Sequence, residues 1–136
     1  PGIFETAMSD DVKRAVLQRP DGSYVSLESP VQPGERLRAF VTGLGRPIAS
    51  SGVLINTNQS GTSGDDALPQ NPVTVRLAGR DIQPVSTVYS TESIGVYVLT
   101  FDVPGDIQTG TDVDFSVLAQ VGDQNVIGKL SKLPVQ

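Results

Sequence analysis

The stretch that decides the fold is residues 94–103, which read IGVYVLTFDV and are followed at once by Pro104 and Gly105. Its larger apolar side chains lie on one face of the stretch and are Tyr97, Leu99, Phe101 and Val103. A period of two over ten residues is typical of a β-strand, and further valines on the other face indicate a central strand with the heaviest burial. Because proline cannot donate a hydrogen bond to a sheet, the strand is expected to end before Pro104.

Two more stretches alternate in the same way, residues 35–42 (ERLRAFVT) and residues 112–121 (DVDFSVLAQV). The second directs valine, phenylalanine and alanine to one face, and Asp112, Asp114 and Ser116 to the other. No window of eleven or more residues sustains the apolar spacing of a helix without a glycine or proline. The chain is therefore predicted to be all-β.

Shorter apolar runs separated by glycine and proline turns complete the pattern. We expect them at residues 12–19, 24–27, 53–55, 73–77, 87–89 and 126–132. Strands of this number and spacing predict an immunoglobulin-like antiparallel β-sandwich of about seven to nine strands, built as a single domain over residues 1–136. A jelly roll or a small barrel fits the same spacing and remains the alternative.

The composition excludes several classes of function. The 136 residues include neither His nor Cys, so the chain has no Ser-His or Cys-His pair, no zinc site of the usual kind and no disulfide. A net charge of −5 argues against nucleic acid as a partner, and no apolar stretch approaches the ~20 residues of a membrane helix. These absences predict a protein that is not an enzyme, has no cofactor and does not insert into a membrane.

Acidic residues gather in the second half of the chain, because residues 81–128 contain no Lys or Arg. Four of them flank the turn between two predicted strands, and these are Asp102, Asp106, Asp112 and Asp114. Carboxylate oxygens are the ligands that calcium prefers, so a calcium site at these four residues is one hypothesis. The alternative is a solvated strand face whose charges prevent edge-to-edge aggregation.

The long polar stretch at residues 56–72 (NTNQSGTSGDDALPQNP) is the predicted partner-binding loop, with Asn58, Ser60, Asp65 and Asp66 as its candidate contacts. Loops of this length without regular structure are uncommon unless they are functional or flexible. Its composition is equally typical of a flexible loop. Tyr24 and Tyr89 are the candidate stacking platforms for a sugar, and cross-strand packing is the alternative role for both.

Several segments taken in order resemble a known family. They are residues 1–4 (PGIF), 21–22 (DG), 30–35 (PVQPGE), 40–45 (FVTGLG), 72–75 (PVTV), 78–79 (AG), 96–97 (VY), 103–104 (VP) and 109–110 (TG). In this order and spacing they resemble the uncharacterised C-terminal domain of Solibacter and other acidobacterial secreted proteins. The resemblance spans nearly the whole chain. Val98 and Thr100 depart from it, since family members tend to carry Gln and Asn there.

The resemblance implies a β-sandwich at the C-terminal end of a large exported polypeptide, often behind β-propeller or immunoglobulin-like repeats, with no established enzymatic activity. We therefore expect a non-catalytic accessory module of a secreted or cell-surface bacterial protein, acting in adhesion, attachment or sorting. Its partners would be neighbouring domains and an extracellular protein or glycan. The alternative is a carbohydrate-binding or calcium-stabilised module, which requires an exposed Tyr24 or Tyr89 beside Asp112 and Asp114.

Overall fold

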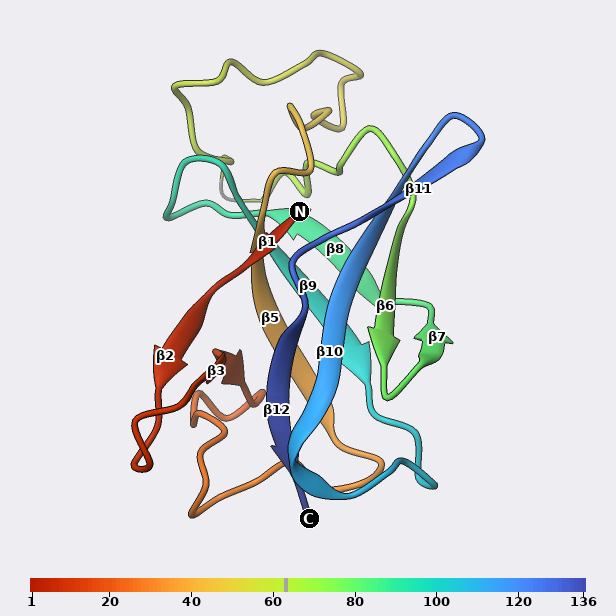
Figure 1. The fold of residues 1–136 in the computed structure, drawn as a ribbon. Helices are drawn as coiled ribbons and strands as arrows, with labels where there is room; N and C mark the ends of the chain where they lie inside the picture. Colours follow the sequence, from red (N-terminus) through yellow and green to blue (C-terminus); the bar gives the residue numbers. More distant parts are fainter. Residues whose placement is uncertain (63) are drawn as a thin grey trace.

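The computed structural model describes residues 1–62 and 64–136, and Figure 1 shows strands joined by turns and long loops. Most strands belong to two antiparallel five-stranded sheets that pack face to face and are not closed into a barrel. The prediction of an all-β antiparallel sandwich is confirmed. No helix in the described residues is long and apolar enough to cross a membrane.

The first sheet has the strand order β1-β5-β9-β8, with β4 beside β5 as well. Its strands are β1 (Gly2–Ile3), β4 (Leu17–Gln18), β5 (Arg36–Thr42), β8 (Ser86–Tyr89) and β9 (Val96–Asp102). β1 and β4 pair with opposite ends of β5, so that Gly2 lies opposite Thr42 and Leu17 lies opposite Ala39. The stretch that decides the fold forms β9, which lies between β5 and β8 as a central strand should.

The second sheet has the order β11-β10-β6-β7, with β12 also paired to β10. Its strands are β6 (Val73–Leu77), β7 (Arg80–Ile82), β10 (Gly110–Val121), β11 (Gln124–Ile127) and β12 (Ser131–Val135). β10 is the longest strand, and β11 and β12 follow one another along the same side of it. Its last residues form a hairpin with β11 that projects at the upper right of Figure 1.

A separate hairpin of β2 (Glu5–Ala7) and β3 (Lys13–Ala15) links the start of the chain to the second sheet. β3 packs beside β12, and the Glu5 carboxylate accepts hydrogen bonds from Ser131 Oγ at 2.7 Å and Lys129 Nζ at 3.0 Å. The Ser131 hydroxyl and the Lys129 ammonium hold the pKa of Glu5 below its ordinary value. The chain therefore starts in the first sheet and reaches β12 of the second sheet through side-chain bonds of Glu5.

The core lies between the two sheets and follows the predicted alternation. The inner face of β9 is buried as expected, and Phe101 stacks on Phe115 of the opposite sheet with ring centroids 5.5 Å apart. β5 also buries one face while leaving Arg36 and other alternate side chains outside. Val121 departs from the prediction and is 50% exposed, because β10 runs beyond the core into the projecting hairpin.

The described residues form twelve strands, more than the seven to nine predicted. Residues 12–19 divide into β3 and β4, because the first pairs with β2 and the second with β5. Residues 126–132 likewise divide at Gly128, where a Cβ atom would lie 2.2 Å from the carbonyl oxygen of Pro1. Residues 24–27 and 53–55 form only isolated bridges.

Candidate functional site

Two buried tyrosines hold the loops at one end of the sandwich, shown at the top of Figure 1. Tyr89 Oη donates to the carbonyl oxygen of Gln59 at 2.5 Å and accepts from the backbone N–H of Gly95 at 2.8 Å. Tyr97 Oη donates to the carbonyl oxygen of Gly45 at 2.9 Å, and the two rings lie 5.2 Å apart. Burial raises the pKa of Tyr97, so its hydroxyl remains a neutral donor.

The predicted partner-binding loop lies at this end, and part of it is tied to β8. The Gly61 N–H donates to the carbonyl oxygen of Ser90 at 2.7 Å, and a Cβ atom at Gly61 would lie 3.1 Å from the carbonyl oxygens of Tyr89 and Ser90. The chain can approach this closely because glycine has no side chain. With the bond from Tyr89 to Gln59, two backbone contacts fix the course of residues 58–62.

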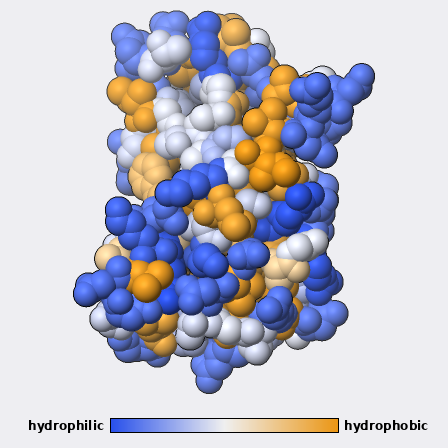
Figure 2. Space-filling model, in the orientation of Figure 1, coloured by the Kyte–Doolittle hydropathy of each residue, from blue (hydrophilic) through white to orange (hydrophobic). Residues whose placement is uncertain are grey.

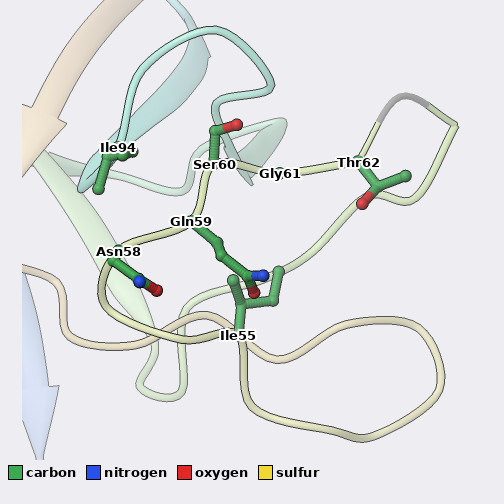
Figure 3. Close-up of a pocket in the computed structure, with 7 residues that line it drawn as sticks. All are labelled: Ile55, Asn58, Gln59, Ser60, Gly61, Thr62 and Ile94. Carbon is green, nitrogen blue, oxygen red and sulfur yellow. The ribbon is translucent and has the colours of Figure 1, made fainter.

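A cavity of about 450 Å³ opens beside this loop (Figure 3). It is lined by Ile55, Asn58, Gln59, Ser60, Gly61, Thr62 and Ile94. In Figure 3 the side chain of Gln59 reaches toward Ile55, whereas that of Ser60 points the other way. The lining thus combines two apolar side chains with amides and hydroxyls that can both donate and accept hydrogen bonds.

A second cavity of about 260 Å³ lies at the same end and is lined by Gly43, Gly45, Arg46, Pro47, Asn56, Thr57, Tyr89 and Gly95. Arg46 Nε donates to the carbonyl oxygen of Ile55 at 3.0 Å, which fixes the base of the guanidinium. Within the described part of the chain, Arg46 has no carboxylate partner. Its remaining donors are available to a ligand. Sequence analysis did not single out Arg46, since an arginine in a glycine-rich turn has no distinctive pattern.

The four predicted contact residues of the loop separate into two pairs. Asn58 and Ser60 line the larger cavity, as a binding role requires. Asp65 instead accepts from the backbone N–H of Ser50 at 3.0 Å. The Ser50 side chain and this backbone bond together hold the pKa of Asp65 below its ordinary value. Asp66 is exposed and lines neither cavity. Residue 63, inside the predicted loop, lies outside the described residues.

The structure does not bring together the four aspartates of the calcium hypothesis. Each has a basic partner, and the shortest distance between their nitrogen and oxygen atoms is 2.8 Å for Asp102 with Arg36, 2.7 Å for Asp106 with Arg80, 3.1 Å for Asp112 with Arg14, and 3.8 Å for Asp114 with Lys132. The described residues contain no group of three acidic side chains that could hold a metal ion. The predicted convergence is therefore corrected to four separate ion pairs.

The reason for this separation is the pairing of strands. Arg36 lies directly opposite Asp102 in the β5–β9 ladder, and Lys132 lies directly opposite Asp114 in the β10–β12 ladder. The acidic half of the sequence is thus neutralised by cations from outside it. The neighbouring Arg36 guanidinium lowers the pKa of Asp102 from its ordinary value, and Arg80 does the same for Asp106.

The arrangement expected for a sugar site with a tyrosine platform is also not formed. Tyr89 is buried and uses its hydroxyl within the protein, and Tyr24 is exposed but lines neither loop-end cavity. Asp112 and Asp114 are occupied by their own cations. The packing alternative holds for Tyr89.

Arg14 is the largest side chain among the fully buried residues, with 1% of its surface exposed. Its Nη1 and Nη2 atoms donate to both oxygens of Asp10 at 2.8 and 2.9 Å, and Nε donates to the carbonyl oxygen of Thr111 at 2.9 Å and to Asp112 Oδ1 at 3.1 Å. Arg14 therefore joins the β2–β3 hairpin to β10. Because Asp10 and Asp112 are far apart in sequence, no local sequence pattern predicts this cluster.

Comparison with models of known protein families, with curated proteins and with solved structures finds no match to this chain. The resemblance to the Solibacter-type domain family therefore stays a prediction.

Proposed function

We propose that the chain is a non-catalytic binding module of a secreted or cell-surface bacterial protein, and that its partner binds at the loop end. The observation that carries this proposal is the backbone anchoring of residues 58–62 by Tyr89 and Ser90. Because backbone groups make these contacts, the side chains of Asn58 and Gln59 stay free for a partner. The family resemblance supports the extracellular address and a role in adhesion, attachment or sorting beside neighbouring domains.

The chemistry of the loop end supports binding over catalysis. A general acid usually has a raised pKa, whereas every described carboxylate with a shifted pKa has it lowered by hydrogen bonds or cations. A third cavity of about 360 Å³ beside β8 and β9 has Glu92 as the single carboxylate of its lining, whereas the described linings of the two loop-end cavities contain no carboxylate. Ser60 and Thr62 lie there without a neighbouring base among the described lining residues, so their hydroxyls serve as hydrogen-bonding groups.

A glycan is the second candidate partner, and the lining of the larger cavity favours it. Its volume of about 450 Å³ falls within the range of small-molecule sites, and its amides and hydroxyls match the alternating donors and acceptors of a sugar. Such a ligand would be recognised by Asn58, Gln59 and Ser60 and would not need a stacked tyrosine. A calcium-stabilised form of this module lacks support in the geometry.

The experiment is a binding screen of the intact chain against glycans and extracellular proteins, followed by Gln59→Ala. We expect this substitution to weaken binding by about tenfold, since it removes an exposed amide at the centre of the contact. Gln108→Ala is the matched control, because Gln108 is an equally exposed glutamine that lines neither loop-end cavity. A partner whose affinity is the same for both variants would contradict the assignment of the loop end.

A further inference from the structure

β11 is an edge strand whose outer side is unpaired within the described residues, where its ladder is with β10 alone. The Gly128 N–H donates to the carbonyl oxygen of Val117, so the backbone of residue 128 faces β10. Backbone direction alternates along an antiparallel strand, so Val126 and Gln124 also face β10. Asn125 and Ile127 therefore direct their N–H and C=O groups outward.

Three other sheet edges, those of β8, β12 and β7, are covered or short, which limits pairing with another chain. The Tyr89 N–H on the outer side of β8 donates to the carbonyl oxygen of Ala67 at 2.8 Å. Beyond β12, Val31 pairs with the last residues of the chain. β7 is only three residues long and begins with the charged pair Arg80 and Asp81. None of these devices is present on β11 in the described structure.

β11 and its surroundings are instead apolar and exposed. The exposed fractions are 50% for Val121, 45% for Val126, 57% for Ile127 and 55% for Leu130. Figure 2 shows a band of hydrophobic surface at the upper right of the molecule, beside the hydrophilic tip of the β10–β11 hairpin. Residues 121–128 carry a single charge, that of Asp123. An exposed apolar edge with open backbone groups is a template for another strand.

We infer that β11 pairs antiparallel with β11 of a second copy of this chain, about a twofold axis at Val126. In this register Asn125 of each copy lies opposite Ile127 of the other. Both residues have outward backbone groups, so the two copies can exchange four backbone hydrogen bonds. The backbone of Val126 faces β10 in both copies, which is what the centre of such a ladder requires.

Charge complementarity selects this register. It brings Asp123, in the turn before β11, toward Lys129 of the other copy, just beyond the end of β11, and Lys129 is 73% exposed although it also forms a salt bridge with Glu5. The two neighbouring registers that also match the outward groups place Asp123 opposite Ile127 or opposite Ser131, where it gains no charge partner. The Lys129 N–H donates to the carbonyl oxygen of Pro1, which ends the ladder there. So short a ladder makes a weak, concentration-dependent dimer.

Hydrogen exchange of the intact chain, measured by NMR at low and high protein concentration, tests the pairing. We expect the amides of Asn125 and Ile127 to exchange about tenfold more slowly at high concentration, because the partner strand then covers them. The amide of Val126 is the internal control, since it is bonded to β10 in the monomer and should not change. Sedimentation should show a dimer over the same range. A monomer at every concentration, or species that keep growing beyond a dimer, would overturn the inference.

Charge substitutions at the tip test the register. Asp123→Lys places like charges opposite one another at both ends of the ladder and should reduce dimerisation by about tenfold. Glu92→Lys makes the same change of charge at an exposed residue in the turn between β8 and β9 and should leave dimerisation unchanged. Equal dimerisation by the two variants would refute the register. Ile127→Lys, at an exposed position on β11, should abolish the dimer.

Discussion

The two ends of the sandwich are held together by different chemistry. At the end where β10 begins, a buried guanidinium, that of Arg14, bonds two carboxylates and a backbone carbonyl. At the opposite end of Figure 1, the hydroxyls of Tyr89 and Tyr97 bond only backbone groups of the loops. Charged side chains make the stabilising hydrogen bonds at the first end, and neutral side chains make them at the second.

This difference separates structure from function. At the Arg14 end, Asp10 and Asp112 are engaged with the arginine, so their charges are not free for a ligand. At the loop end, the side chains of Asn58 and Gln59 are left over after the loop has been fixed. A site that is positioned by its backbone and keeps its side chains free is prepared to bind. The same comparison explains why the cluster of Arg14, Asp10 and Asp112 stabilises the fold and does not bind a ligand.

Removing the buried guanidinium breaks the first end and has the largest expected effect. Arg14→Met should lower the free energy of unfolding by about 2 kcal/mol, since it removes the hydrogen bonds of a buried guanidinium while Asp10 and Asp112, which are 40% and 42% exposed, stay hydrated. Urea denaturation measures this loss. The loops at the other end should keep their hydrogen-exchange protection below the unfolding transition, because nothing in the tyrosine contacts changes.

Arg14→Lys distinguishes the shape of the arginine from its charge. Lysine keeps the charge but cannot bond Asp10 through two parallel N–H groups, so we expect most of the stability to be lost. A fully stable lysine variant would show that charge alone fastens this end. If Arg14→Met were as stable as the natural chain, the hydrogen bonds of Arg14 would contribute nothing to the free energy of unfolding.

The sequence predicted the sandwich because alternation is a local property. The faces of β5 and β9 follow directly from residues 35–42 and 94–103, and both are buried as expected. The short strands β1 and β2 were missed because pairing across the fold, and not a pattern of two or three residues, defines them. The loop at residues 56–72 was recognised from composition, although its anchoring by Tyr89 was not.

The ion pairs could not be predicted in the same way. Grouping Asp102, Asp106, Asp112 and Asp114 assumed that neighbours in sequence stay neighbours in space. Strand pairing instead brings cations from distant segments to each of them, such as Arg36 to Asp102. Which cation faces which carboxylate depends on register, and register is set by the whole sheet. Charge clusters in β-proteins are therefore weak predictors of metal sites.

Removing the hydroxyl of Tyr89 weakens the second end, and we expect a smaller loss of stability than for Arg14→Met. Tyr89→Phe keeps the buried ring but loses the bonds to Gln59 and Gly95, at a cost of about 1 kcal/mol. The loss should be local, so the Gly61 amide should exchange faster while amides of β9 and β10 keep their protection. Uniform loss of protection would show that the tyrosine supports the whole core and not the loop alone.

Acid should loosen the Arg14 end while leaving the tyrosine contacts of the other end intact, which sharpens the comparison between them. Arg14 holds the pKa of Asp10 at about 2, below its ordinary value of 3.8. Such a carboxylate contributes its full stability above pH 3.8 and loses that contribution as the pH falls to about 2. The amides of the β2–β3 hairpin should therefore lose protection in this window, while Gly61 keeps its own because the Tyr89 contacts carry no charge.

Asp10→Asn should be less stable than the natural chain at neutral pH and equal to it near pH 2. In the Arg14→Met background the same substitution should have a much smaller pH dependence, because the cation that contributes most to the lowered pKa is gone and the backbone N–H of Val12 remains. An undiminished pH dependence there would show that Arg14 does not control this end.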